Sequence, residues 1–166
     1  MLVIGIDPGT ARTGYGLIQQ SDSGSLDLVD FGVIETSPKL PMSERLLKLH
    51  HDLQELLAQH KPVEAAVERL FFQKNVKTAI TVGQARGVAI LALAELGLNI
   101  KEYSPQEIKQ AVTGYGAAEK GQVQRMVQNL LEMDDLPRPD DAADALAVAI
   151  CHCYSSKLER RIEGAE

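Results

Sequence analysis

The chain opens with an apolar run, Leu2-Val3-Ile4-Gly5-Ile6, that ends at Asp7-Pro8-Gly9. A short and almost uninterrupted apolar run favours a strand buried on both faces, and Pro-Gly predicts a turn at its carboxyl end. We therefore expect residues 2–7 to form a central strand of an α/β fold, with Asp7 placed where that strand ends.

The following residues predict the rest of the sheet and its helices. Short links around the turn-forming Ser21-Asp22-Ser23-Gly24 imply an antiparallel meander of the first three strands, and a leucine-rich helix then leads to a parallel fourth strand. The other expected strands cover residues 13–19, 26–36, 64–70 and 99–103. The expected helices cover residues 43–61, 76–96, 105–112, 118–131 and 140–154.

The length of 166 residues suits a single domain, which we expect over residues 1–154, followed by a polar and flexible tail over 155–166. The amino-terminal residues lack the features of a signal peptide, and the apolar runs are too short to span a membrane. Cys151 and Cys153 suggest neither a disulfide nor a zinc site. These features predict a cytoplasmic protein.

The charge is unevenly distributed along the chain. The net charge is −6, but residues 69–125 hold eight basic and four acidic side chains. Because phosphate binding depends on the local patch, this balance is compatible with a nucleic-acid partner. An ordinary mixed surface is the alternative.

Two carboxylates are expected at the ends of interior strands. Asp7 could serve only as a turn residue that hydrogen-bonds its own backbone before Pro8-Gly9. Glu68 is harder to explain structurally, because a carboxylate at the end of a buried strand is costly unless it is paired or bound to metal. Its neighbour Arg69 should point to the opposite face of the sheet, so a structural ion pair of Glu68 would require another cation.

Asp141 and Asp144 form the second expected pair. At positions i and i+3 of a helix they share one face, with Cβ atoms roughly 5–6 Å apart. Helix capping would explain one acidic residue in the first turn, but not Asp144, which is followed by Ala, Leu, Val and Ile.

Four carboxylates in one cleft would repel one another unless cations neutralised them. Oxygen ligands favour Mg²⁺, with Mn²⁺ as a substitute, over zinc. Two such ions about 3.5–4 Å apart are a known device for phosphodiester hydrolysis. We therefore predict a metal-dependent nuclease whose catalytic and metal-binding residues are Asp7, Glu68, Asp141 and Asp144.

Several sequence blocks, in the same order, resemble the bacterial RuvC family of Holliday junction resolvases. They are Ile6-Asp7-Pro8-Gly9-Thr10 with Thr13-Gly14-Tyr15-Gly16, Val67-Glu68, Gly83-Gln84-Ala85-Arg86-Gly87, and Asp141-Ala142-Ala143-Asp144-Ala145-Leu146-Ala147. The resemblance runs from about residue 2 to 154. It implies a ribonuclease-H-like mixed five-stranded sheet, with three antiparallel and two parallel strands flanked by helices.

The resemblance also implies a function and partners. Family members act as homodimers that cut four-way DNA junctions with paired symmetric nicks in recombination and repair, leaving 5′-phosphate ends, and they work with the RuvA and RuvB branch-migration proteins. A two-fold junction has a physical match in a two-fold dimer. We expect the dimer contact on the small-residue face of the 76–96 helix, which includes Gly83, Ala85, Gly87, Ala89 and Ala92.

Further residues match DNA-contacting positions of the family. Phe71 is expected to stack on a base near the crossover, although it could be ordinary core. Lys109 and Lys120 match basic positions near the scissile phosphate, with a solvated helix lysine as the alternative. Arg86 and Lys74 are weaker candidates for phosphate contacts.

Three other functions are alternatives to this one. An actin-like ATPase would use Asp7-Pro8-Gly9-Thr10 as a phosphate loop, but it needs a second domain for which 166 residues leave no room. A silent junction-binding module would not need four carboxylates. An RNA-processing nuclease on the same fold remains an alternative.

Overall fold

In the computed structural model of the protein, residues 1–69 and 76–163 are described, and they form one five-stranded sheet. The strands are β1 (Leu2–Asp7), β2 (Arg12–Gln20), β3 (Leu26–Glu35), β4 (Glu64–Glu68) and β5 (Asn99–Tyr103). Their spatial order is β3-β2-β1-β4-β5, with β1, β2 and β3 antiparallel and β4 and β5 added in parallel to β1. The predicted mixed sheet with a central first strand is therefore confirmed.

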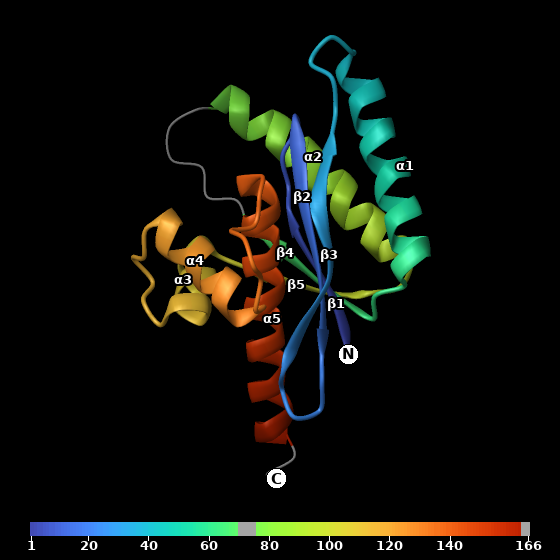
Figure 1. Ribbon diagram of the computed structural model, residues 1–166. Coiled ribbons are helices and arrows are strands. Elements are labelled where there is room, and N and C mark those ends of the chain that lie inside the picture. The colour runs from blue at the N-terminus through green and yellow to red at the C-terminus, as the bar shows by residue number, and fades with distance from the viewer. Residues whose placement is uncertain (70–75, 164–166) are drawn as a thin grey trace.

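Helices cover both faces of this sheet (Figure 1). They are α1 (Met42–His60), α2 (Val76–Glu95), α3 (Pro105–Thr113), α4 (Lys120–Leu130) and α5 (Asp140–Glu163). One core lies between the sheet and α1 with α2, and it contains Ile4, Leu17, Leu53 and Leu93. The other lies between the sheet and the three remaining helices. Strand residues alternate between the two cores, because successive side chains of a strand point to opposite faces.

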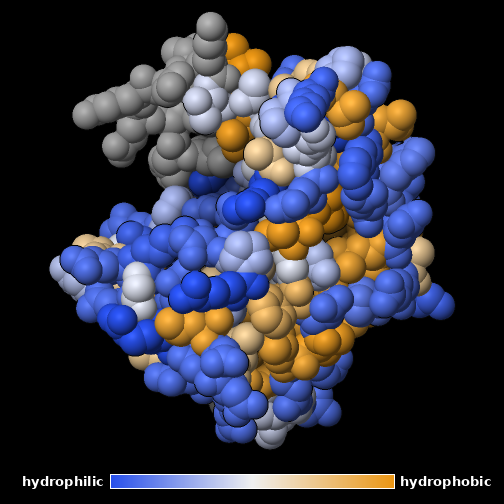
Figure 2. All heavy atoms as spheres, turned by 45° about the horizontal axis from the view of Figure 1, so that its top comes forward, coloured by the Kyte–Doolittle hydropathy of each residue, from blue (hydrophilic) through white to orange (hydrophobic). Residues whose placement is uncertain are grey.

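The described helices include none that is long and apolar enough to cross a membrane. On the face shown in Figure 2, hydrophilic residues dominate and hydrophobic ones gather in separate patches between them. Cys151 and Cys153 are buried, and neither forms a disulfide within the part of the chain that the structure describes.

Helix α5 packs directly on the backbone of β1 and β2, because glycines leave room for it. A Cβ atom at Gly14 would lie 1.9 Å from the carbonyl oxygen of Asp141, and one at Gly5 would lie 2.3 Å from that of Ala145. Gly14 is the register partner of Asp7. The close contact therefore holds the first turn of α5 beside the carboxyl end of β1.

This contact predicts the effect of adding one methyl group. Gly14→Ala should push α5 away from the sheet and lower the free energy of unfolding by about 1–3 kcal/mol, as overpacking usually does. Gly121→Ala is the matched control, because the nearest atom to an added Cβ lies 3.7 Å away, in the Arg125 side chain, and alanine favours a helix. Chemical denaturation of both variants measures the difference; equal stabilities would contradict the close packing.

The last helix is longer than expected. We predicted a helix to about residue 154 and a flexible polar tail over 155–166, but α5 continues to Glu163. The residues after 154 include Lys, Leu, Glu and Arg, which favour helices, and no Gly or Pro interrupts them before Gly164. Lys157 also donates to the carbonyl oxygen of Ser23 at 2.9 Å, which ties this end of α5 to the β2–β3 turn.

Candidate active site

Asp7 and Glu68 meet at the carboxyl ends of two neighbouring parallel strands. Ile6 pairs with Val67 in the β1–β4 register, so the next residue of each strand is one of the two acids. Both side chains point to the α5 side of the sheet, because two residues earlier the Cβ position of Gly5 and the side chain of Ala66 face that side. Their carboxyl groups are hydrogen-bonded to one another, so they share a proton.

Asp141 and Asp144 face this pair from the first two turns of α5. Each is half-buried, and between them Ala142 and Ala143 are buried in the core. The charges of both aspartates act on Asp7. The structure therefore brings together the four carboxylates that the sequence predicted to meet, from three separate segments of the chain.

Crowding and burial raise the pKa values of three of these groups, Asp7, Glu68 and Asp144. Burial, followed by the charge of Glu68 and a hydrogen bond with it, raises the pKa of Asp7 to about 8, and the charges of Asp144 and Asp141 add to the effect. Burial also raises the pKa of Glu68 and that of Asp144. Near neutral pH the cluster therefore retains a proton on the Asp7–Glu68 pair, as expected for carboxylates that are buried close together.

Two lysines bring positive charge to the cluster. The Nζ atom of Lys120, at the start of α4, lies 2.9 Å from Asp144 Oδ2 and 3.3 Å from Asp140 Oδ2. Partial burial lowers the pKa of Lys120, but the bonds to these aspartates outweigh it and leave the pKa raised. Lys109 of α3 acts on Glu68, and the charges of Lys120 and Lys109 both lower the pKa of that carboxyl.

A cavity of about 220 Å³ opens beside these groups; Glu68, Lys109, Lys120 and Asp144 are among its lining residues. Since a water molecule occupies about 30 Å³ in the liquid, the cavity has room for a hydrated ion or a phosphate group. Carboxylates and ammonium groups thus share one opening, an arrangement suited to a cation–phosphate complex.

The donor set suits a hard divalent cation. Four carboxylates supply oxygen ligands only, the kind that Mg²⁺ and Mn²⁺ prefer. In the described part of the chain, no three Asp, Glu, His or Cys side chains lie close enough together to ligate one ion as they stand. Instead, Asp7 and Glu68 share a proton, and Asp144 is bonded to Lys120. Binding of a cation requires that the proton leave and that these side chains turn toward the ion.

This proton leads to a prediction on metal binding. Because the pKa of Asp7 is about 8 in the metal-free protein, Mn²⁺ should displace about one proton per chain at pH 7 and none well above pH 9. Calorimetry in two buffers of different ionisation enthalpy counts the released protons. Binding at pH 7 without proton release would contradict the shared proton. As a control, Asp22→Asn, which changes an acid in the exposed β2–β3 turn, should release as many protons as wild type.

The raised pKa of Asp7 also makes the stability of the metal-free protein depend on pH. The pKa of Asp7 is higher in the folded chain than the ordinary 3.8, so its contribution to metal-free stability is present below pH 4 and is lost as pH rises toward 8. In EDTA, Asp7→Asn should therefore become increasingly stabilising relative to wild type across this range. Thermal unfolding at pH 5 and pH 8 measures the change; a constant difference would contradict it.

The structure describes only one of the other residues that were predicted to contact DNA. Arg86 forms an ion pair with Glu102 of β5 at 2.5 Å, so its charge is already engaged within the protein. Arg69 donates to the carbonyl oxygen of Glu102 and makes no ion pair with Glu68, in line with the expected opposite orientation. Phe71 and Lys74 lie outside the described residues.

Sequence analysis missed a buried polar network behind the site. His152 is 1% exposed; its Nε2 lies 2.6 Å from Glu64 Oε2 and its Nδ1 lies 2.9 Å from the Tyr103 hydroxyl. His152 follows Asp144 by eight residues, which places it on the same helix face. The network links α5 to β4 and β5, the strands beside the cluster. A histidine within the apolar stretch of residues 145–153 was the available signal.

Comparisons with known proteins identify what the chain is similar to. Residues 3–152 match the model of the family "Crossover junction endodeoxyribonuclease RuvC". The chain is 56% identical to the crossover junction endodeoxyribonuclease RuvC of Roseiflexus sp. (strain RS-1) over 160 residues, which cover 96% of this chain and 95% of that protein.

Solved structures give the same relationship. The chain superposes on Thermus thermophilus RuvC with a TM-score of 0.87 and 35% identity, covering 96% of this chain and 97% of the other. It matches T. thermophilus RuvC in complex with a Holliday junction substrate equally well, with a TM-score of 0.87, 34% identity, and 95% and 96% of the two chains covered.

Proposed function

The chain belongs to the RuvC family of crossover junction endodeoxyribonucleases, and we propose that it resolves four-way DNA junctions by one symmetric nick in each of two strands. The observation that carries this proposal is the convergence of Asp7 and Glu68 with Asp141 and Asp144 beside an opening lined by two lysines. The family match supports DNA hydrolysis, and it gives no support to an RNA-processing nuclease or an actin-like ATPase.

We propose that the four carboxylates hold two Mg²⁺ ions, for which Mn²⁺ can substitute. When bound, such ions activate a water molecule and stabilise the charge on the leaving oxygen. In the hydrolysis, the water oxygen forms a bond to phosphorus and the bond to the 3′ oxygen breaks. The products are a 5′-phosphate and a 3′-hydroxyl end, the latter after the 3′ oxygen gains a proton.

The two lysines have a different task from the carboxylates. Because the pKa of Lys120 is raised, it keeps its proton near neutral pH and supplies a positive charge at the opening. Lys109 lines the same opening. Together they draw the DNA backbone toward a cluster that would otherwise repel it.

A homodimer supplies the two sites that paired nicks require. We propose that the partner chain packs on the exposed face of α2, where Gly83 and Gly87 are exposed and have no atom within 4 Å of an added Cβ. Ile80 and Leu91 lie at helical spacing on this face and are 58% and 52% exposed. Small residues between two exposed apolar ones allow a second helix to approach closely and bury them.

This surface is narrower than the one predicted from sequence. Ala85, Ala89 and Ala92 were expected at the dimer contact, but all three are buried in the core between α2, α1 and the sheet. Alanine and glycine were read as one small-residue face, whereas they occupy opposite sides of the helix. The α2 face of Ile80, Gly83, Gly87 and Leu91 is the part that remains available to a partner.

We further propose that the protein acts in the cytoplasm with the RuvA and RuvB branch-migration proteins, as the family resemblance implies. Contacts of Phe71, Lys74 and Arg86 with DNA stay predictions. Of these, Arg86 would first have to exchange its partner Glu102 for a phosphate.

Cleavage of a synthetic junction tests the proposed function. The protein should nick a four-way junction in Mg²⁺ at paired positions and leave linear duplex of the same sequence intact, and EDTA should stop cleavage. A ribosomal-RNA fragment serves as the competing substrate. Cleavage of RNA in preference to the junction, or junction nicking that survives EDTA, would reject the proposal.

A further inference from the structure

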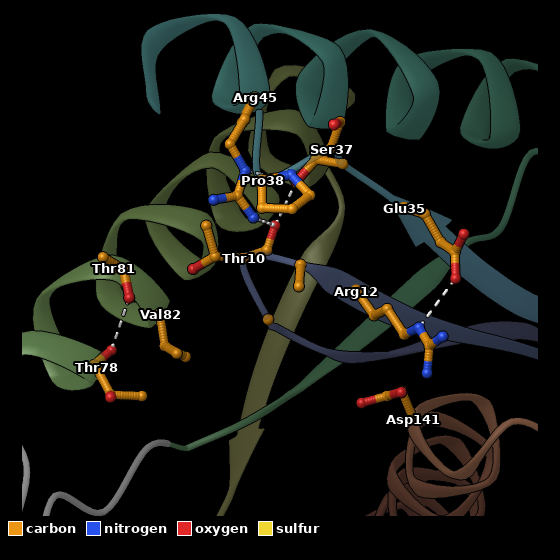
Figure 3. Close-up of a pocket in the computed structure, with 13 residues that line it drawn as sticks. Thr10, Arg12, Glu35, Ser37, Pro38, Arg45, Thr78, Thr81, Val82 and Asp141 are labelled. Carbon is orange, nitrogen blue, oxygen red and sulfur yellow. Dashed lines mark hydrogen bonds and ion pairs between the residues drawn. The ribbon is translucent and has the colours of Figure 1, made fainter. Parts of the chain in front are cut away.

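A second hollow lies on the other side of the first turn of α5. It has a volume of about 880 Å³ and is bordered by the β1–β2 turn, the end of β3, α1 and the start of α2 (Figure 3). Asp141 lines this hollow, whereas Asp144 lines the smaller cavity beside Lys120. The two openings therefore flank the carboxylate cluster, and the larger one has room for more than one nucleotide unit.

Arg45 projects from α1 into the hollow without a carboxylate partner. Its Nε donates to Thr36 Oγ1 at 2.9 Å and its Nη2 donates to the carbonyl oxygen of Thr10 at 3.0 Å. Thr36 Oγ1 donates in turn to that carbonyl at 2.5 Å, so the plane of the guanidinium is fixed. Among the side chains that the structure describes, no acidic one lies within ion-pair distance of Arg45.

This lack of an acid is unusual for the position. Arg45 is half-buried, and a guanidinium has five donors, of which the neutral acceptors above engage two. Arg12 on the same wall differs, because its Nε is paired with Glu35 at 2.9 Å and its side chain is 53% exposed. A partly desolvated cation held in a fixed orientation by neutral groups is suited to an anion that arrives from outside.

Thr10 provides an independent sign of an absent ligand. Its Oγ1 is buried and has no hydrogen-bond partner among the described residues, although buried hydroxyls are nearly always bonded. Thr10 also lines the hollow, and its own carbonyl oxygen is the one that accepts the hydrogen bond from Arg45. Across the hollow, Thr78 of the first turn of α2 adds a further residue with a hydroxyl group to the lining.

From these contacts we propose that the hollow at Arg45 and Thr10 binds a backbone phosphate of the cleaved DNA strand, a few nucleotides from the scissile bond. This inference rests on the proposed function. The strand would then pass from Arg45 across the carboxylates to Lys109 and Lys120, with a phosphate held on each side of the bond that breaks. Such contacts fix the register of the strand without reading its sequence.

Neutralising single phosphates tests this subsite. A series of four-way junctions, each with one methylphosphonate at a stated position near the nick, is assayed in Mg²⁺ for the KM and kcat of cleavage. With wild type, a methylphosphonate at one position other than the scissile phosphate should raise KM about 10- to 100-fold, which is the range for one charge-assisted contact. With Arg45→Gln, KM on the unmodified junction should rise by a similar factor, and the same methylphosphonate should then change KM less than twofold.

Conservative variants separate binding from a structural role. Arg45→Lys should restore part of the sensitivity of KM to that methylphosphonate. Thr10→Val should reduce the effect of the same methylphosphonate on KM without altering the thermal unfolding midpoint. Lys48→Gln, one turn along α1 and paired with Asp52, is the matched control and should keep the wild-type profile. If Arg45→Gln or Thr10→Val leaves the profile of wild type unchanged, the inference is wrong. Absence of junction cleavage by wild type would instead reject the proposed function itself.

Discussion

Replacement of Asp7 with asparagine is expected to lower the rate of junction cleavage by at least about a thousandfold, or about 4 kcal/mol of transition-state stabilisation. Asp7 lies at the centre of the cluster, because Glu68, Asp141 and Asp144 all act on its pKa. The amide retains the shape of the side chain but removes the charge that a cation needs. Single-turnover nicking of a labelled junction in Mg²⁺ measures the loss.

Binding should not follow the loss of cleavage. In EDTA near neutral pH the Asp7–Glu68 pair already holds a proton, so an uncharged asparagine at position 7 leaves the charge of the pair unchanged, and junction affinity should equal that of wild type. Asp22→Asn, which changes an exposed acid in the β2–β3 turn, should preserve both cleavage and binding. If Asp7→Asn retained a tenth of the wild-type rate, Asp7 would be no more than the turn residue considered at first.

Gly87→Glu is expected to separate the dimer and to uncouple the two nicks. In a two-fold contact each added glutamate faces its symmetry mate or the apolar Ile80 and Leu91, and either arrangement opposes association. The dimer dissociation constant should rise at least about a hundredfold, which corresponds to about 2.7 kcal/mol. Sedimentation measures the association, and a supercoiled cruciform plasmid distinguishes paired from single nicks.

The matched control for Gly87→Glu is Leu47→Glu on α1. Leu47 is also an exposed apolar residue, 57% accessible, but it lies outside the α2 face. Its variant should remain a dimer with paired nicks. A Gly87→Glu protein that sediments as a dimer would place the contact on another surface.

The fold was largely predictable because local signals agreed with the tertiary structure. The apolar run before Asp7 and the leucine spacing of α1 indicated a buried strand and an amphipathic helix, and both elements formed. Their pairing order came from the resemblance to a known family, since the spacing of elements alone allows other α/β arrangements. The predicted end of the last helix was wrong by about nine residues, because the polar composition after residue 154 was taken as evidence of fraying.

The site was predictable only in part, for a physical reason. Asp7, Glu68, Asp141 and Asp144 each stood out as an acid in apolar surroundings, and burial makes such acids exceptional. Arg45 had no such signal, because it lies among Ser, Glu and Lys on an ordinary amphipathic helix. Its environment depends on Thr10 and Thr36, which come from other segments, so only the tertiary structure reveals that it has no acidic partner.

The role of glycine was also hidden from sequence reasoning. Gly5 and Gly14 lie within strands, where glycine lowers local β-propensity and suggests an irregularity. In the structure they let the backbone of α5 approach the sheet and thereby bring Asp141 to the Asp7 end of β1. A close approach of this kind joins residues that are more than 120 positions apart and leaves no local periodic pattern.

Anomalous scattering from Mn²⁺ tests the central claim most directly. Crystals of the full chain with a four-way junction, grown or soaked in Mn²⁺, should show anomalous peaks bounded by carboxylate oxygens of Asp7, Glu68, Asp141 and Asp144. The same crystals of Asp7→Asn should lose at least one of these peaks. Manganese found only at other sites, with none at these carboxylates, would contradict a nuclease that works through these four acids.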